Sequence, residues 1–96
     1  MEEIWTMKVR IGARANRQLI EIADYIRLRD ARASIHVRDR IRETFAILGE
    51  FPRIGREGKV RGTREILVAG QPFIVIYRVR KDAVMILGVH HCAQER

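Results

Sequence analysis

The stretch from Gly62 to His91, GTREILVAGQPFIVIYRVRKDAVMILGVHH, constrains the fold more than any other part of the chain. Apolar and β-branched residues dominate it, and turn residues interrupt it at only two points, Gly70-Gln71-Pro72 and Lys81-Asp82. Because connections this short join antiparallel neighbours, the stretch predicts hairpin-linked strands. The three expected strands cover residues 63–69, 73–80 and 83–90. The remainder of the chain has to cover this meander.

The segments before the meander predict one strand and two helices. Alternation over Lys8–Ile11 indicates a short strand that suits a sheet edge. Apolar residues recur every three or four positions over Ala13–Arg29 and again over Ala31–Leu48, which is typical of amphipathic helices. Asp30 is the expected N-cap of the second helix and Gly49 its expected stop. The prediction is an α+β fold of order β-α-α-β-β-β, an antiparallel helix hairpin packed on a mainly antiparallel sheet in two layers.

Length and charge narrow the class of protein. A chain of 96 residues is expected to form a single domain over residues 1–96, with residues 1–6 as a candidate N-terminal extension. Cys92 is the single cysteine, so no internal disulfide is expected and a reducing cytoplasm is favoured. No apolar run is long enough to predict a membrane span. The net charge of +7 is carried mostly by arginine, which predicts an anionic partner.

A basic segment, FPRIGREGKVRG at residues 51–62, precedes the meander. Its glycines and proline predict a loop without regular structure. The segment contains a single acid, Glu57, and four cations, which are Arg53, Arg56, Lys59 and Arg61. A basic, glycine-rich loop of this kind can surround an anion. The spacing matches no phosphate-loop motif. An ordinary charged surface connection is an equally open interpretation.

Four polar side chains in the meander are candidates for function. Arg64 begins the first strand and is either a phosphate or carboxylate clamp or a structural ion-pair partner. Arg78 and Arg80 share one strand face and are candidates for contact with an acidic partner. His90 is either a general acid or base or a hydrogen-bonded structural residue. His91 is its neighbour on the strand and points to the opposite face, so we expect neither a metal site nor a cofactor.

Four stretches in register resemble the RelE/ParE toxin superfamily of bacterial type II toxin–antitoxin systems. They are IEIADYI at 20–26, LGEFPRIGR at 48–56, GTREILVAGQPFIVIYRV at 62–79 and GVHHCAQ at 88–94. Together they cover about residues 9–94, and the third stretch is the most specific. The resemblance implies the same strand, helix hairpin and meander order that the residues indicate.

Two branches of that superfamily have different activities. The RelE branch resembles ribosome-dependent endoribonucleases, but Glu65, Leu67 and Ile74 stand here where that branch has cations. The ParE branch inhibits DNA gyrase without chemistry of its own, and the sequence is more similar to it at 64–66, 77–79 and 89–90. A ParE-like gyrase inhibitor with no catalytic residues is therefore expected. Two alternatives are an inactive binding-only member and a RelE-like nuclease that uses Arg61, Arg64, Arg78 and His90.

The resemblance also implies partners. A cognate antitoxin is expected, with a ribbon-helix-helix-like or similar DNA-binding domain and an acidic tail. The tail is expected to lie across the apolar helix hairpin and the sheet and to contact Arg64, Arg78 and Arg80. DNA gyrase is the expected target, and the ribosome with its mRNA is the alternative. The residues expected to contact the target or another anion are Arg53, Arg56, Lys59, Arg61 and His90.

Overall fold

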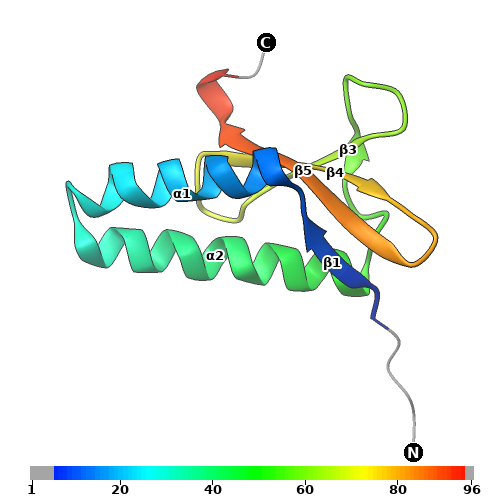
Figure 1. Ribbon diagram of the computed structural model, residues 1–96, viewed down its shortest axis with the longest axis horizontal. Helices are drawn as coiled ribbons and strands as arrows, with labels where there is room; N and C mark the ends of the chain where they lie inside the picture. The colour runs from blue at the N-terminus through cyan, green and yellow to red at the C-terminus, as the bar shows by residue number, and fades with distance from the viewer. Residues whose placement is uncertain (1–5, 95–96) are drawn as a thin grey trace, which may run out of the picture.

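The computed structural model describes residues 6–94 and shows the predicted succession of elements with two additions (Figure 1). In chain order the elements are β1 (Lys8–Ile11), α1 (Ala13–Arg27), α2 (Ala31–Glu50), β2 (Arg56–Glu57), β3 (Arg64–Leu67), β4 (Phe73–Val79), β5 (Ala83–His91) and a final 3-10 turn (Cys92–Gln94). The additions are β2 and the 3-10 turn. The α+β class and the helix hairpin on a mainly antiparallel sheet are confirmed.

The five strands form one sheet in the order β1-β5-β4-β3-β2. β1 runs parallel to β5 at one edge, as its predicted edge position allows, and every other pair is antiparallel. The register of β4 with β5 shifts after Ile76, which pairs with Gly88, because Tyr77 pairs with Ile86. Leu87 is therefore an extra residue in a bulge, a feature that bends a strand and increases its twist.

The prediction of an unstructured loop over residues 51–62 is wrong at its centre. Arg56 and Glu57 pair with Glu65 and Arg64 and extend the sheet beyond the meander. The N–H of Gly58 donates to the carbonyl of Thr63 at 2.8 Å and continues this pairing. A two-residue strand is too short to show a period-2 pattern, so its existence depends on the neighbouring β3 and not on its own sequence.

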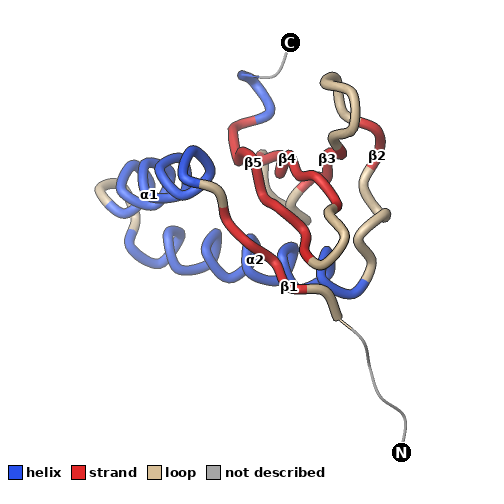
Figure 2. Tube along the Cα trace, turned by 45° about the vertical axis from the view of Figure 1, so that its right-hand side comes forward, coloured by secondary structure: helices blue, strands red, loops and turns tan. Residues whose placement is uncertain are grey.

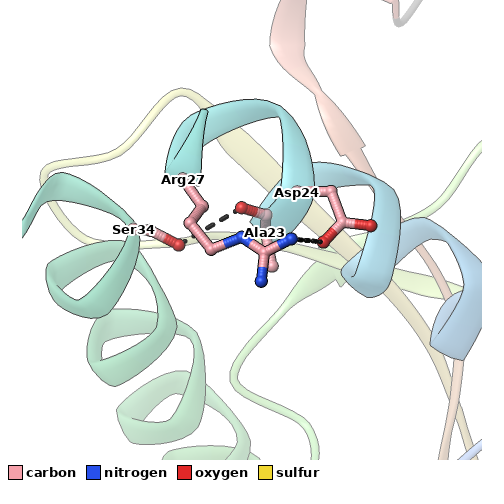
Figure 3. A network of polar contacts seen from close by, with 4 residues as sticks. All are labelled: Ala23, Asp24, Arg27 and Ser34. Atoms are coloured by element: carbon pink, nitrogen blue, oxygen red, sulfur yellow. Dashed lines mark hydrogen bonds and ion pairs between the residues drawn. The ribbon is translucent and has the colours of Figure 1, made fainter. Parts of the chain in front are cut away.

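The helix hairpin closes through the predicted cap. Asp30 Oδ1 accepts hydrogen bonds from the N–H groups of Arg32 at 3.0 Å and Ala33 at 3.2 Å, which confirms Asp30 as the N-cap of α2. α1 ends at Arg27, two residues before the predicted end, because the residues after it form the turn to α2. Ser34 Oγ donates to the carbonyl of Ala23 at 3.3 Å and ties the two helices together (Figure 3).

The second helix passes through Gly49, where the sequence predicted its stop, and ends at Glu50. Gly49 is buried against the start of β1, and its carbonyl accepts a hydrogen bond from the N–H of Met7 at 2.8 Å. A Cβ at this position would lie 3.0 Å from the Met7 carbonyl oxygen. The glycine therefore permits the close approach of α2 to the residue before β1. In the sequence, a glycine with this long-range role cannot be distinguished from a glycine that ends a helix.

The core lies between the hairpin and one face of the sheet. α1 packs chiefly on β5 and α2 on β1, so the helices lie near the β1–β5 edge of the sheet. β2 and β3 form the opposite edge, away from the helices (Figure 2). On β4, Val75 and Tyr77 belong to this core and are fully buried. The opposite face of β4 is buried at Ile74 and half-buried at Ile76 and Arg78, and Arg80, which follows the strand, is exposed.

The candidate N-terminal extension, residues 1–6, lies outside the described residues except for Thr6. Within residues 6–94, neither helix has the length and apolar character that crossing a membrane requires.

Candidate functional site

A polar cavity of about 400 Å³ lies at the end of the sheet beyond the helices. We call it the basic cup. Its lining residues are Arg53, Glu57, Gly58, Arg61, Gly62, Thr63, Arg64 and Val79. Three guanidinium groups, one carboxylate and one hydroxyl thus border the same space, with Val79 as the apolar contribution. Three of the residues assigned a binding role from the sequence, Arg53, Arg61 and Arg64, are brought together here.

Arg64 and Tyr77 fix the frame of the basic cup. Arg64 Nη1 donates to the carbonyl of Gly55 at 2.8 Å and to that of Arg53 at 3.3 Å. The N–H of Gly55 donates to the Tyr77 hydroxyl at 2.9 Å, in a buried position. The segment before β2 is therefore held on the sheet by both its N–H and its C=O groups. The structural alternative for Arg64 has a physical basis here, although its partners are carbonyl groups and not the predicted acid.

The environment of Tyr77 shifts the pKa of its phenol hydroxyl. Burial raises the pKa of Tyr77 above its ordinary value of about 10, although the Gly55 N–H and the charge of Arg64 act in the opposite direction. The hydroxyl is therefore neutral at physiological pH and acts as a hydrogen-bond acceptor. No local signal in the sequence indicates that the Tyr77 hydroxyl holds Gly55, a loop residue 22 positions earlier in the chain.

The other predicted arginines surround the cup without lining it. Arg56 forms an ion pair at 3.0 Å with Glu65, a carboxylate that is only 5% exposed. The guanidinium of Arg78 lies against Gly62, where a Cβ would be 2.6 Å from Nη1. Arg80 lines a separate cleft beside the cup, and Arg53 borders both. The predicted trio of Arg64, Arg78 and Arg80 therefore faces more than one surface, and Lys59 lies exposed in the β2–β3 turn.

His90 lies at the other end of the sheet. It pairs with Ile74, four residues along β4 from Arg78, a separation of roughly 13 Å at the rise of a strand. His90 and His91 border a cavity of about 680 Å³ between α1 and the β3–β4 turn. The ring of His91 contacts Phe73 edge-on, with centroids 5.6 Å apart. The set Arg61, Arg64, Arg78 and His90, considered for a nuclease, is therefore not assembled in one place.

A third surface is an apolar groove on the helix hairpin. We call it the hairpin groove. It has a volume of about 190 Å³ and is lined by Ile11, Leu19, Ile22, Ala23, Ile26, Ser34, Val37, Arg38, Ile41, Arg42 and Phe45. The apolar stripes of both helices meet in it and leave Leu19, Ile22 and Phe45 only partly buried. In the sequence, the high apolar content of α1 is the signal that could have indicated this groove. The same helix also leaves Ile20 and Tyr25 exposed.

Within residues 6–94, no three His, Cys, Asp or Glu side chains are grouped so that they could hold a metal ion. The described part of the chain thus offers a basic cup, an apolar groove and a histidine-bordered cavity. The basic cup combines positive charge with a defined shape, and the hairpin groove combines apolar surface with a defined shape. Both surfaces are suited to binding a partner.

Comparison with known proteins identifies the family. The family model for the ParE toxin of the type II toxin-antitoxin system, parDE, matches residues 9–96. The chain is also 40% identical over 88 residues to the "Putative toxin Y4kP" of Sinorhizobium fredii (strain NBRC 101917 / NGR234), covering 92% of this chain and 91% of that protein.

Two solved structures share the fold. A chain of the chromosomal ParDE toxin–antitoxin system from P. aeruginosa superposes with a TM-score of 0.80 at 21% identity, over 90% of this chain and 96% of that one. A chain of the RelBE2 toxin–antitoxin complex from Mycobacterium tuberculosis gives a TM-score of 0.62 at 22% identity, over 95% and 97%. The fold resemblance and the family match agree. The chain belongs to the ParE toxin family of type II toxin–antitoxin systems.

Proposed function

We propose that this toxin inhibits DNA gyrase by binding it, and that a cognate antitoxin holds it inactive in the cytoplasm. The observation that carries the proposal is the match of the ParE toxin model to residues 9–96, nearly the whole described chain. The resemblance of this family to gyrase inhibitors, noted from the sequence, supplies the target. The antitoxin is supported by the toxin–antitoxin complexes in which the two similar structures occur.

The arrangement of the polar groups favours binding over chemistry. Ribonucleolytic cleavage needs cations at the phosphate and a nearby group to move the proton of the 2′-hydroxyl. Here the Arg64 guanidinium is hydrogen-bonded to two loop carbonyls, and His90 lies at the far end of the sheet from the basic cup. These positions support a toxin that acts as an inhibitor and not as a nuclease.

The hairpin groove is the site that we propose for the antitoxin. It offers an apolar floor between two helices, with Arg38 and Arg42 at its border. An amphipathic helix binds such a groove through its apolar face, and acidic residues beside that face would meet the two arginines. A disordered acidic tail that folds on binding has this character. The antitoxin would carry a DNA-binding domain of the ribbon-helix-helix or a similar type outside the groove.

A supercoiling assay with purified gyrase tests the target. Purified toxin should inhibit supercoiling in a concentration-dependent way, and addition of the antitoxin should restore it. Unchanged supercoiling at large molar excess of toxin would contradict the gyrase proposal. Cleavage of mRNA on translating ribosomes, lost in His90→Ala, would identify the nuclease alternative instead.

Calorimetric titration with the acidic tail of the antitoxin tests the groove. Arg42→Glu reverses a charge at the groove border and should weaken binding at least tenfold. Arg17→Glu makes the same charge change on α1 outside the groove and should leave the affinity within about twofold. Equal losses in both variants would place the antitoxin elsewhere.

A further inference from the structure

The positive charge of this protein is concentrated in one short segment. Residues 51–64 contain five cations, Arg53, Arg56, Lys59, Arg61 and Arg64, against the single acid Glu57. This segment therefore carries a net charge of +4 out of the +7 of the whole chain. Residues 13–50, which form both helices, contain eight arginines but also six acidic residues. The largest excess of positive charge consequently lies in the segment that leads into the β2–β3 edge of the sheet.

Acidic neighbours form ion pairs with several of the helix arginines, whereas no arginine that lines the cup forms one within residues 6–94, although Glu57 borders the same cavity. Arg27 pairs with Asp24 at 3.1 Å and Arg40 with Glu43 at 3.1 Å. By contrast, within residues 6–94 the side chains of Arg53, Arg61 and Arg78 make no hydrogen bond or ion pair. Two of these three line the cup, and the third lies against Gly62 at its border. Their donors are available to an anion from outside the chain.

The backbone around the cup is fixed before any ligand arrives. The β2–β3 turn is closed by two hydrogen bonds, from the Gly58 N–H to the Thr63 carbonyl at 2.8 Å and from the Thr63 N–H to the Val60 carbonyl at 3.0 Å. Gly62 has a φ of +82°, a left-handed conformation that glycine adopts without strain. The Arg64 contacts described above hold the opposite wall. A rigid frame reduces the ordering cost of binding.

We propose that the basic cup binds a backbone phosphate of a nucleic acid, with Arg53 and Arg61 as its direct ligands. Guanidinium groups match phosphate oxygens in a bidentate geometry, and Arg78 and Lys59 reinforce the field around them. The lining is polar except for Val79, so it lacks the apolar anchors that a protein segment would use, in contrast to the hairpin groove. The proposal does not depend on gyrase being the target.

The chemistry of the cup also defines the kind of recognition. Phosphate contacts position a nucleic acid but carry no sequence information. We therefore expect binding that is insensitive to base sequence and strongly dependent on salt, because each neutralised phosphate releases counterions. For duplex DNA, the slope of log affinity against log salt should be about −0.9 for each phosphate contacted.

Fluorescence anisotropy with short labelled oligonucleotides tests this site on the full chain. Separate titrations with duplex DNA, single-stranded DNA and single-stranded RNA identify which source of phosphate is preferred. The double variant Arg53→Gln with Arg61→Gln should weaken binding at least tenfold and reduce the duplex salt slope by about 0.9, the share of the one phosphate that both arginines bind. Both residues are exposed, and neither side chain forms a hydrogen bond or ion pair within residues 6–94, so the variant should fold, which circular dichroism checks.

The matched control is the double variant Arg17→Gln with Arg32→Gln, which removes the same charge from exposed positions on the helices. Its affinity should fall no more than about twofold. The proposal is overturned if both double variants lose affinity equally, since binding would then reflect overall charge alone. It is also overturned if no oligonucleotide binds at low salt, or if polyglutamate of equal charge competes as well as the oligonucleotide does.

Discussion

The hydrogen bond between Tyr77 and Gly55 allows one prediction to be worked through in full. Tyr77→Phe removes the hydroxyl and leaves the ring, so the core keeps its packing and no large cavity forms. The N–H of Gly55, a buried residue, loses its partner at 2.9 Å. A buried donor left unsatisfied costs about 1–3 kcal/mol in the free energy of unfolding. In a domain of this size, each kcal/mol corresponds to a decrease in Tm of about 4–8 °C.

Urea denaturation followed by circular dichroism measures this loss. The midpoint should shift to lower urea while the slope stays the same, because the surface exposed on unfolding is unchanged. Tyr25→Phe is the matched control, since Tyr25 is 59% exposed and its hydroxyl makes no hydrogen bond in the described part of the chain. Its effect should stay within about 0.5 kcal/mol. A Tyr77→Phe protein as stable as the Tyr25→Phe protein would refute the reasoning.

Two further predictions concern the same contact and the helix cap. Because burial raises the folded-state pKa of Tyr77 above its unfolded value, stability present below pH about 10 should be lost as pH rises through the folded pKa. Urea midpoints measured from pH 8 upward should show this alkaline loss in the wild type, and a loss of the same size in Tyr77→Phe would contradict it. Asp30→Ala removes the acceptor of two N–H groups and should lower the free energy of unfolding by about 1 kcal/mol. Asp30→Asn keeps an acceptor oxygen and should retain most of this free energy. Equal losses in Asp30→Ala and Asp30→Asn would argue against capping by this side chain.

Local patterns were sufficient for the succession of the larger elements. The two turn signals at 70–72 and 81–82 separate the strands of the meander, and the cap at Asp30 separates the helices. Such signals are written within a few residues, since hydrophobic period and turn chemistry act over short distances. The same kind of pattern misplaced the end of α2, because Gly49 serves an approach to Met7 that lies far away in the chain.

The candidate site was only partly predictable. The cations of residues 51–64 are visible in the sequence, and the structure gathers Arg53, Arg61 and Arg64 around one cavity. The same sequence offered no way to learn that His90 lies at the opposite end, because that distance depends on strand register. It also could not show that the apolar stripes of the two helices leave an open groove between them.

The amino-acid sequence by itself determined the succession of the larger helices and strands, the strong positive charge and the resemblance to a toxin family, since each is carried by local composition and spacing. The tertiary structure alone decided which charges act together. It directs Arg64 to the loop carbonyls, leaves Arg53 and Arg61 at the edge of the cup and adds β2 to the sheet. These outcomes depend on contacts between segments distant in the chain, which form only when the sheet sets its register and the helices cover one side of it.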